Sequence, residues 1–250
     1  MLTRDTFFNN VTLANKSAIC TAGFRLFVRG TLSLDPTSKV HNNGNPALGQ
    51  KAGPGLMTRN VGGSSAGSDG GDARADGQNV DNEYMSQSTG GSGGRGGDGA
   101  IQLGGLAGQP GRVATSTDSY HCLNSSVVAL STFKLSGLQG GAGGSGGAGG
   151  PQGPGGGGGS GGGVCWVAAR TLSGAGCIEA NGGRGGDATN PLGGAGAGGG
   201  GGCVVCVYQS TTAGFHVNDQ VLALPGAIGQ VGLKRNAVPA SPGQVFCFKV

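Results

Sequence analysis

The chain is short of charged and aromatic residues, which make up 11% and 5% of its 250 residues. Its only glutamates are Glu83 and Glu179, and no window is rich in the helix formers Ala, Leu, Glu and Lys. A helical protein is therefore excluded, and a doubly wound α/β enzyme is disfavoured on the same ground. The scarcity of carboxylates also argues against a β-helical glycan hydrolase, which needs a carboxylate pair. We expect no enzymatic activity.

Long apolar runs are also missing. No window reaches the length of about 18 apolar residues that crosses a membrane, so we expect no membrane insertion. The N-terminus lacks the basic and apolar pattern of a signal peptide. The net charge of +4 is spread along the chain, which argues against nucleic-acid binding. With 36% hydrophobic residues the chain is not a disordered polyelectrolyte.

Catalytic and metal-binding motifs are present in form only. Gly-x-Ser-x-Gly occurs around Ser92, Ser145 and Ser160, but none has the flanking strand and helix of a nucleophile elbow. The chain has seven cysteines, an odd number, and most have apolar neighbours. We therefore interpret them as small buried hydrophobic residues of a protein made in a reducing compartment. Cys203 and Cys206 have CxxC spacing, but in a strand they would face opposite sides. We therefore expect no catalytic residue, no cofactor and no metal.

Glycine is what the chain has in abundance, at 60 residues. It concentrates in tracts at about 90–111, 140–163 and 182–202, partly as Gly-Gly-X triplets. A period of three suits a polyproline-II-type helix with about three residues per turn. Bare glycine backbones can approach closely and exchange hydrogen bonds, so we expect the tracts to pack side by side. A flexible glycine linker is the alternative.

The sequence Gly-Gly-Arg-Gly-Gly-Asp occurs at 93–98 and again at 182–187. Its Arg and Asp would lie roughly 9 Å apart along one edge of a tract. This arrangement predicts either a solvated edge or a contact with a neighbouring tract. The unit formally resembles a calcium β-roll repeat, but the copies are not in tandem and lack the large apolar residue that follows the aspartate.

Strand-forming segments surround these tracts. We divide the chain into an N-terminal β segment (1–50), a polar Gly/Ser/Asp-rich excursion (51–89), three glycine tracts interleaved with strands (90–202) and a C-terminal β segment (203–250). We expect these segments to be intertwined as one structural unit. Residues 27–44 and 167–182 share a strand, Thr-Leu-Ser, a turn and Asn-Gly, which indicates stacked coils of a solenoid or related layers of one sheet. The expected fold is all-β: β-solenoid or sandwich-like strands interleaved with packed polyglycine-II-type tracts, with essentially no α-helix.

The order of strand, Thr-Leu-Ser, Asn-Asn-Gly and glycine tracts that end at Cys203–Tyr208 resembles glycine-rich virion surface proteins of tailed bacteriophages. More loosely, it resembles the distal tail-fibre adhesins of T-even-like phages. The resemblance implies a non-enzymatic spike, fibre-tip or capsid decoration protein on the virion surface, synthesised in the host cytoplasm. Its partners would be other virion proteins and a host surface glycan or protein receptor. A glycine-rich surface or ice-binding scaffold outside a virion is the alternative.

Apolar strands that need partners predict self-association, most simply as a homotrimer. Packed glycine tracts offer few side chains, so recognition is expected in the segments between them. The candidates combine aromatic and hydrogen-bonding residues. They are Arg112, Asp118, Tyr120, His121 and Asn124 in one segment, and Arg74, Asp76, Asn79, Asp81 and Tyr84 in the other.

Overall fold

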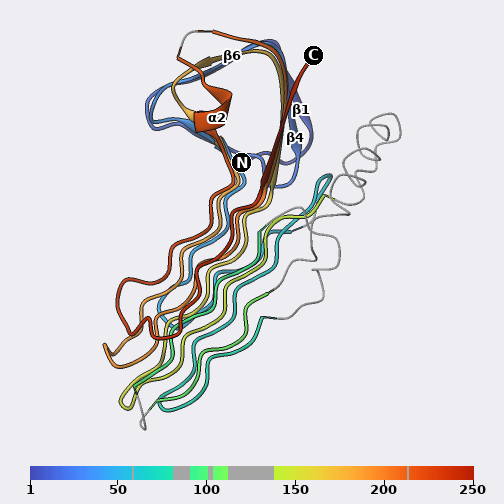
Figure 1. Ribbon diagram of the computed structural model, residues 1–250. Helices are drawn as coiled ribbons and strands as arrows, with labels where there is room; N and C mark the ends of the chain where they lie inside the picture. Colours follow the sequence, from blue (N-terminus) through green and yellow to red (C-terminus); the bar gives the residue numbers. More distant parts are fainter. Residues whose placement is uncertain (58, 81–90, 101–103, 112–137, 213) are drawn as a thin grey trace.

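The computed structural model describes residues 1–57, 59–80, 91–100, 104–111, 138–212 and 214–250. The molecule is elongated, with two β-sheets at one end and a bundle of extended tracts at the other (Figure 1). Sheet A contains β1 (Thr6–Phe8), β2 (Val11–Leu13), β4 (Arg25–Leu34), β6 (Val164–Gly174), β8 (Cys203–Thr211) and β10 (Gln244–Lys249). Sheet B contains β3 (Ala18–Cys20), β5 (Lys39–His41), β7 (Cys177–Glu179) and β9 (Val221–Leu222). The described residues form one helix, α2 (Val217–Gln220).

The main hydrophobic core lies between the two sheets. Leu26, Val28 and Leu32 of β4 alternate with outward residues and are almost completely buried. Val40 of β5 and Ile178 of β7 supply the opposing side chains from sheet B and are fully buried. The alternation places leucine and β-branched side chains on the inward face of each sheet, where they pack against the side chains of the other sheet.

Every strand pair in both sheets is parallel. The two sequence repeats lie side by side, because Thr31, Leu32 and Ser33 pair in register with the second Thr-Leu-Ser, at 171–173. The expected fold class, β-solenoid or sandwich-like strands, is wrong: although the two sheets pack face to face, each is an open, all-parallel array, and the described residues show no solenoid. Parallel neighbours need long crossovers. The connections that lead into β6, β8 and β10 pass through the bundle, whereas the one from β2 to β4 passes through β3 of sheet B. The expectation of an all-β chain agrees in part, since α2 has only four residues.

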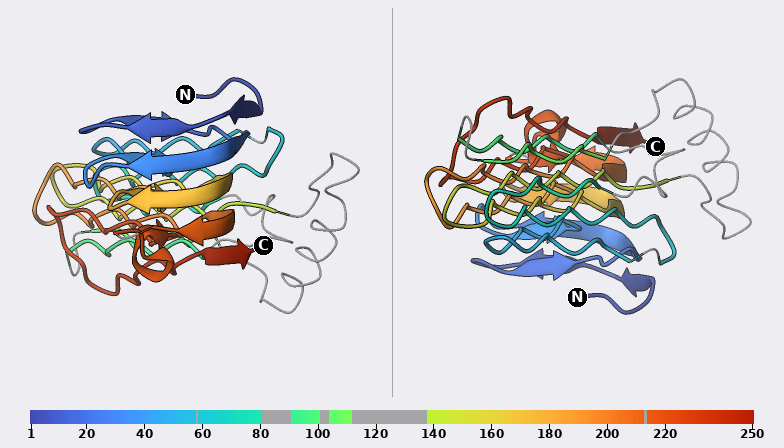
Figure 2. Two further views of the ribbon diagram at one scale, coloured as in Figure 1. Left: turned by 90° about the horizontal axis from the view of Figure 1, so that it is seen from above. Right: turned by 90° about the horizontal axis from the view of Figure 1, so that it is seen from below.

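The tracts of the bundle begin where the strands end and run away from the sheets (Figure 1). The hydrogen bonds group these tracts into four rows. Figure 2 shows extended tracts lying side by side along the strands. The first row contains tracts 42–49, 180–188 and 223–231, and the second contains 51–57, 154–163, 193–202 and 233–243. The third row contains 61–72, 138–150 and 91–100, and the fourth contains 75–80 and 104–111. Tracts within a row run parallel, and successive rows run in opposite directions. Residues 51–80, which the sequence suggests are a polar excursion, thus supply three of these tracts.

Hydrogen bonds between tracts repeat every third residue. Gly141, Gly144 and Gly147 donate to carbonyls of tract 154–163 at 2.7–2.8 Å. Their neighbours Ala142, Ser145 and Ala148 donate instead to tract 91–100 at 2.9–3.0 Å. A helix with about three residues per turn aims successive amides at different neighbours, as observed here. The tracts are therefore cross-linked in more than one direction.

The three most glycine-rich tracts, 138–150, 154–163 and 193–202, are each hydrogen-bonded to six neighbouring tracts. Most positions on them therefore leave no room for a side chain. A Cβ atom added to Gly158 would lie 1.9 Å from the carbonyl oxygen of Gly144, and one added to Gly161 would lie 1.9 Å from that of Gly141. Glycine is required at these positions because the neighbouring backbone occupies the space of a side chain.

Towards the margin of the bundle, side-chain oxygens replace missing backbone acceptors. The Asn181 amide donates to Asn43 Oδ1, and the Leu224 amide donates to Asn181 Oδ1, each at 2.8 Å. Inside the bundle, Ser145 Oγ accepts from the Gly96 amide at 3.0 Å, and Ser160 Oγ accepts from the Asn45 amide at 2.8 Å. Short polar side chains therefore satisfy donors that would otherwise be buried without a partner.

The two Arg–Asp hexapeptides form the same ion pair in different surroundings. Arg95 contacts Asp98 at 2.8 Å, and Arg184 contacts Asp187 at 2.6 Å. The Asp98 side chain is only 6% exposed and also accepts from the Ala107 amide and from Asn236, both at 2.8 Å. The Asp187 side chain is 38% exposed. Asp187 also accepts hydrogen bonds from the Gln230 and Val231 amides, so both hexapeptides connect neighbouring tracts, and they differ in the burial of their ion pairs.

We expect Ala142→Val to lower the free energy of unfolding by about 1–3 kcal/mol, because the fully buried Ala142 has no room for a branched side chain. Ala227→Val makes the same change at an exposed position of an outer tract and should be neutral within about 0.5 kcal/mol. Urea denaturation followed by circular dichroism measures both. Equal stabilities for the two variants would contradict a close-packed bundle.

Asp98→Ala should destabilise the protein by roughly 3–5 kcal/mol, because it leaves the largely buried Arg95 without its carboxylate. Asp187→Ala, in the identical hexapeptide, should cost less, about 1–2 kcal/mol, because its ion pair is solvated and the main loss is that of the hydrogen bonds from the Gln230 and Val231 amides. Thermal unfolding of the two single variants provides the comparison. A larger loss for Asp187→Ala would show that the burial assigned to these pairs is wrong.

Candidate functional site

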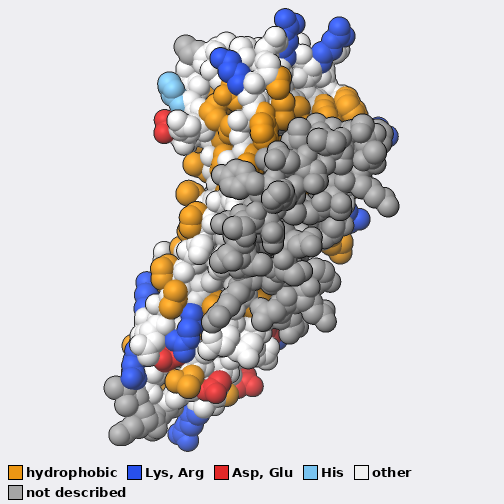
Figure 3. Space-filling view, turned by 45° about the vertical axis from the view of Figure 1, so that its right-hand side comes forward, with side chains coloured by type: hydrophobic (Ala, Val, Ile, Leu, Met, Phe, Trp, Pro, Cys, Tyr) orange, Lys and Arg blue, Asp and Glu red, His pale blue; other side chains and the backbone are white. Residues whose placement is uncertain are grey.

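The outward face of sheet A, turned away from sheet B, carries a row of apolar side chains across five strands. The register places Phe7 beside Phe27, and Phe27 beside Ala168. Ala168 lies beside Val207, and Val207 beside Phe248. We call these five residues the apolar row. Phe7 is 72% exposed, and Phe27, Ala168, Val207 and Phe248 are partly exposed. Figure 3 shows apolar side chains gathered at this end of the molecule.

Below the apolar row, the same face is covered by the bundle. Its third and fourth rows extend past the sheet on this side (Figure 1). Val61 and Leu138, at the sheet end of two of these tracts, join a buried cluster with Val164, Trp166 and Val205. The bundle therefore covers the lower part of the outward face, and the apolar row lies at the border of the covered area.

Two aromatic side chains of the apolar row, Phe7 and Phe27, contact each other and neighbouring residues. The rings of Phe7 and Phe27 are stacked, with centroids 4.5 Å apart and an interplanar angle of 4°. Trp166 lies against Phe27 at 5.1 Å, tilted by 51°. The Arg25 guanidinium lies 5.7 Å from the centre of the Phe27 ring. Stacked and cation–π contacts order these rings before any partner arrives.

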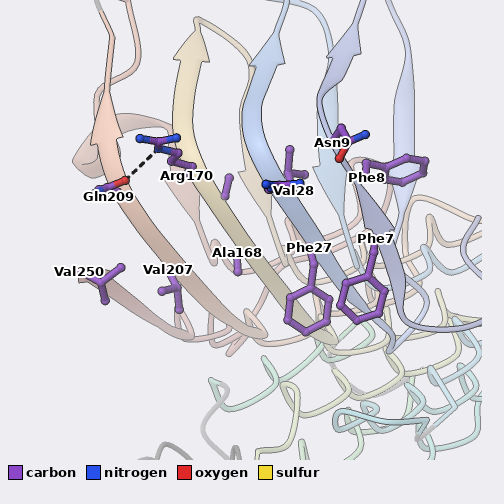
Figure 4. Close-up of a pocket in the computed structure, with 12 residues that line it drawn as sticks. Phe7, Phe8, Asn9, Phe27, Val28, Ala168, Arg170, Val207, Gln209 and Val250 are labelled. Carbon is purple, nitrogen blue, oxygen red and sulfur yellow. Dashed lines mark hydrogen bonds between the residues drawn. The ribbon is translucent and has the colours of Figure 1, made fainter.

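A shallow hollow of about 750 Å³ opens over Ala168, where a small side chain follows two large rings (Figure 4). Phe7, Phe27, Val207 and Val250 lie around it. Its polar margin consists of Asn9, Arg29, Arg170 and Gln209, and Arg170 donates to Gln209 at 3.1 Å. Arg29 and Arg170 are exposed. Among the described residues, no acidic side chain lines the hollow.

Strand β1, which supplies Phe7, is fixed to β4 by an ion pair. Asp5 accepts hydrogen bonds from the Arg25 amide at 2.8 Å and from Arg25 Nε at 2.7 Å. Burial tends to raise the pKa of Asp5, but the hydrogen bonds from the side chain and backbone of Arg25 outweigh it, so the pKa is lowered. The charged pair therefore holds one edge of the apolar row in place.

Most of the sequence-predicted recognition residues lie outside the described residues: Arg112, Asp118, Tyr120, His121, Asn124, Asp81 and Tyr84. Arg74 lies in a turn at the end of the bundle far from the sheets, with a φ of 63°. Asp76 Oδ1 accepts from the Leu106 amide at 2.6 Å, and Asn79 Oδ1 accepts from the Gln109 amide at 2.7 Å. These two side chains complete the hydrogen bonding of the fourth row.

The described cysteines are thiols distributed over both faces of the sheets. Cys203 belongs to the outward cluster and Cys206 to the inward core, so the CxxC pair is split by the alternation of the strand. Burial raises the pKa of the Cys165 thiol. In the part of the chain that the structure describes, no group of three or more His, Cys, Asp or Glu has a geometry that would hold a metal ion. Nor do the described residues contain a helix long and apolar enough to span a membrane.

The apolar row escaped the sequence analysis, although β4 carries a signal for it. In Arg25-Leu-Phe-Val-Arg29, Leu26 and Val28 fill the inward face, while Phe27 lies on the outward one. A parallel strand that is apolar on both faces indicates a sheet covered on both sides. The pairing of Phe7 with Phe27 had no such local signal, since they are 20 residues apart and meet only through the register.

No family model, no curated protein and no solved structure matches this chain. The functional interpretation therefore depends on the physical properties of its surfaces.

The Asp5–Arg25 pair should make the sheet edge sensitive to acid. Because the pKa of Asp5 is lowered in the folded state, its stabilising effect is complete above the unfolded value of about 3.9 and is lost as the pH falls through the folded pKa. Asp5→Asn should therefore be less stable than the wild type at pH 7, and the difference should shrink below about pH 4. Urea denaturation across this pH range measures it. A pH-independent difference would rule out the carboxylate as its source.

Proposed function

We propose that this protein is a non-enzymatic structural protein on the outside of a phage particle. It would act as a spike, fibre tip or capsid decoration protein that serves host attachment, shell stabilisation or both. The main support is the bundle, in which three tracts each have six hydrogen-bonded neighbours. Such a cross-linked body resists bending and keeps its two ends at a fixed separation. This is a mechanical property that a surface projection needs.

The two ends differ in the side chains that they offer. The sheet end carries the apolar row and the arginines beside it. The far end consists of turns between tracts, with exposed polar residues such as Lys51, Arg74 and Lys234. Attachment to other virion proteins through the sheet end would leave the far turns directed outwards, towards a host surface glycan or protein. The segments that contain Tyr84 and Tyr120 remain separate candidates for recognition, because the residues that follow them, Gly91 and Leu138, lie at the sheet end of the bundle and not at the far turns.

The open sheets support self-association as a homotrimer. Among the described residues, no strand pairs with the outer side of β10 or of β1 and β2. Both edges carry exposed apolar side chains, Phe7 and Phe8 on one and Val245 on the other. Unpaired parallel edges of this kind are completed in assemblies by a strand of another subunit.

An ice-binding scaffold would use the same glycine packing with a flat, regular outer face. The first row instead carries Asn43, Arg184 and Asp187 at its surface. Charged side chains of different length interrupt any regular array. The bundle surface therefore favours the structural role in a particle over the scaffold role.

Immunogold labelling of the intact source particle tests the proposal, using antibody raised against the folded protein. We expect gold at fixed positions on the outside of the particle, and we expect the protein among the components of purified particles by mass spectrometry. Purified particles that lack the protein would overturn the proposal. Thermal hysteresis measured on the pure protein would then distinguish the ice-binding alternative.

A further inference from the structure

The outward face of sheet A has the properties of an unfilled interface. All-parallel sheets occur almost only with both faces covered, and here sheet B covers the other face. Above the cluster that contains Trp166, the described residues leave the apolar row partly exposed. Aromatic side chains together with arginine are the composition that is enriched at protein interfaces.

We propose that this face binds an acidic amphipathic helix of another protein, with its apolar side on the apolar row and its carboxylates on Arg29 and Arg170. The proposal rests on the side chains of this face and does not require a phage particle.

The charges around the hollow specify the acidic character of the partner. Arg29 and Arg170 are exposed on its margin, and no described acidic residue lines it. An apolar partner with carboxylates on one flank would therefore gain both burial and charge pairing. A basic partner would bring its positive charges next to Arg29 and Arg170, and this repulsion would weaken its binding.

In a second copy of this chain, Asp35, Asp72, Asp76 and Asp219 are the described carboxylates that form no ion pair; the other five are committed. Asp5, Asp98 and Asp187 are already held in ion pairs with arginines of the same chain. Asp69 pairs with Lys51, and Glu179 pairs with Lys39. Placing any of these carboxylates on Arg29 would break an existing pair. A partner with carboxylates along one flank of a helix fits better, because Asp35, Asp72 and Asp76 lie outside helices and α2, which carries Asp219, has only four residues.

The backbone of the face specifies a helix. The inner strands β4, β6 and β8 each have a hydrogen-bonded strand on both sides, so their backbone groups are occupied within the sheet. An extended segment lying on this face would bury its own amides without partners, whereas a helix satisfies them internally. The apolar row crosses five strands, or about 19 Å at the usual strand spacing, which corresponds to about 13 helical residues.

The test uses two fluorescein-labelled helical peptides with the same apolar stripe, one with glutamate and one with lysine at the polar positions. Fluorescence anisotropy should show saturable binding of the glutamate peptide to the full chain and at least about tenfold weaker binding of the lysine peptide. The double variant Arg29→Glu/Arg170→Glu should reverse this preference. The matched control, Arg74→Glu/Lys234→Glu, makes the same charge change in the far turns and should leave it unaltered.

Several outcomes would overturn the proposal. One is failure of the glutamate peptide to bind, which would mean that this chain covers the face itself. Another is equal binding of both peptides, or binding that the control variant changes as strongly as the double variant. Sedimentation that shows a dimer broken by Ala168→Glu would assign the face to a second copy. Near-UV circular dichroism verifies that each variant is folded.

Discussion

Close contact between glycine backbones is the interaction on which the rest of this structure depends. Each hydrogen bond between tracts stabilises the folded state by about 1 kcal/mol net. Ordering the backbone costs roughly 1–2 kcal/mol per residue. A single tract would therefore not remain ordered. Tracts with six neighbours bond in several directions, and they have the purest glycine sequence. The parallel order of β4, β6, β8 and β10 follows from the same constraint, because the chain passes through the bundle before it enters β6, β8 and β10.

Side chains enter this arrangement in two ways. Ala142 and Ala148 fill the few spaces that accept a methyl group, and both are fully buried. Asn43, Asn181 and Asp98 accept hydrogen bonds where a neighbouring backbone carbonyl is missing. Towards the outside of the bundle, short polar residues therefore take over the role that carbonyl groups have within it. Ser145 and Ser160, in sequences that mimic a catalytic elbow, act in the same way.

The sequence predicted the period of the bundle better than the arrangement of the sheets. The triplets around Ala142 and the spacing of Arg95 and Asp98 are local patterns, so they follow from about three residues per turn. The parallel, open order of the strands depends on where the chain returns after each passage, which no local pattern encodes. For the same reason Asp76 and Asn79 were interpreted as recognition residues: their amide partners lie 30 residues away. The apolar row was missed because its five members come from five strands.

The threefold period also restricts how the length of this molecule can change. Inserting one residue into tract 154–163 would rotate all later residues by about a third of a turn and aim Ser160 at a different neighbour. Inserting three would restore every direction and add roughly 9 Å of tract. Because successive rows run in opposite directions, the tracts on both sides of a turn would have to grow together. The reach of the molecule is therefore adjustable only in whole turns, added in pairs at its far end.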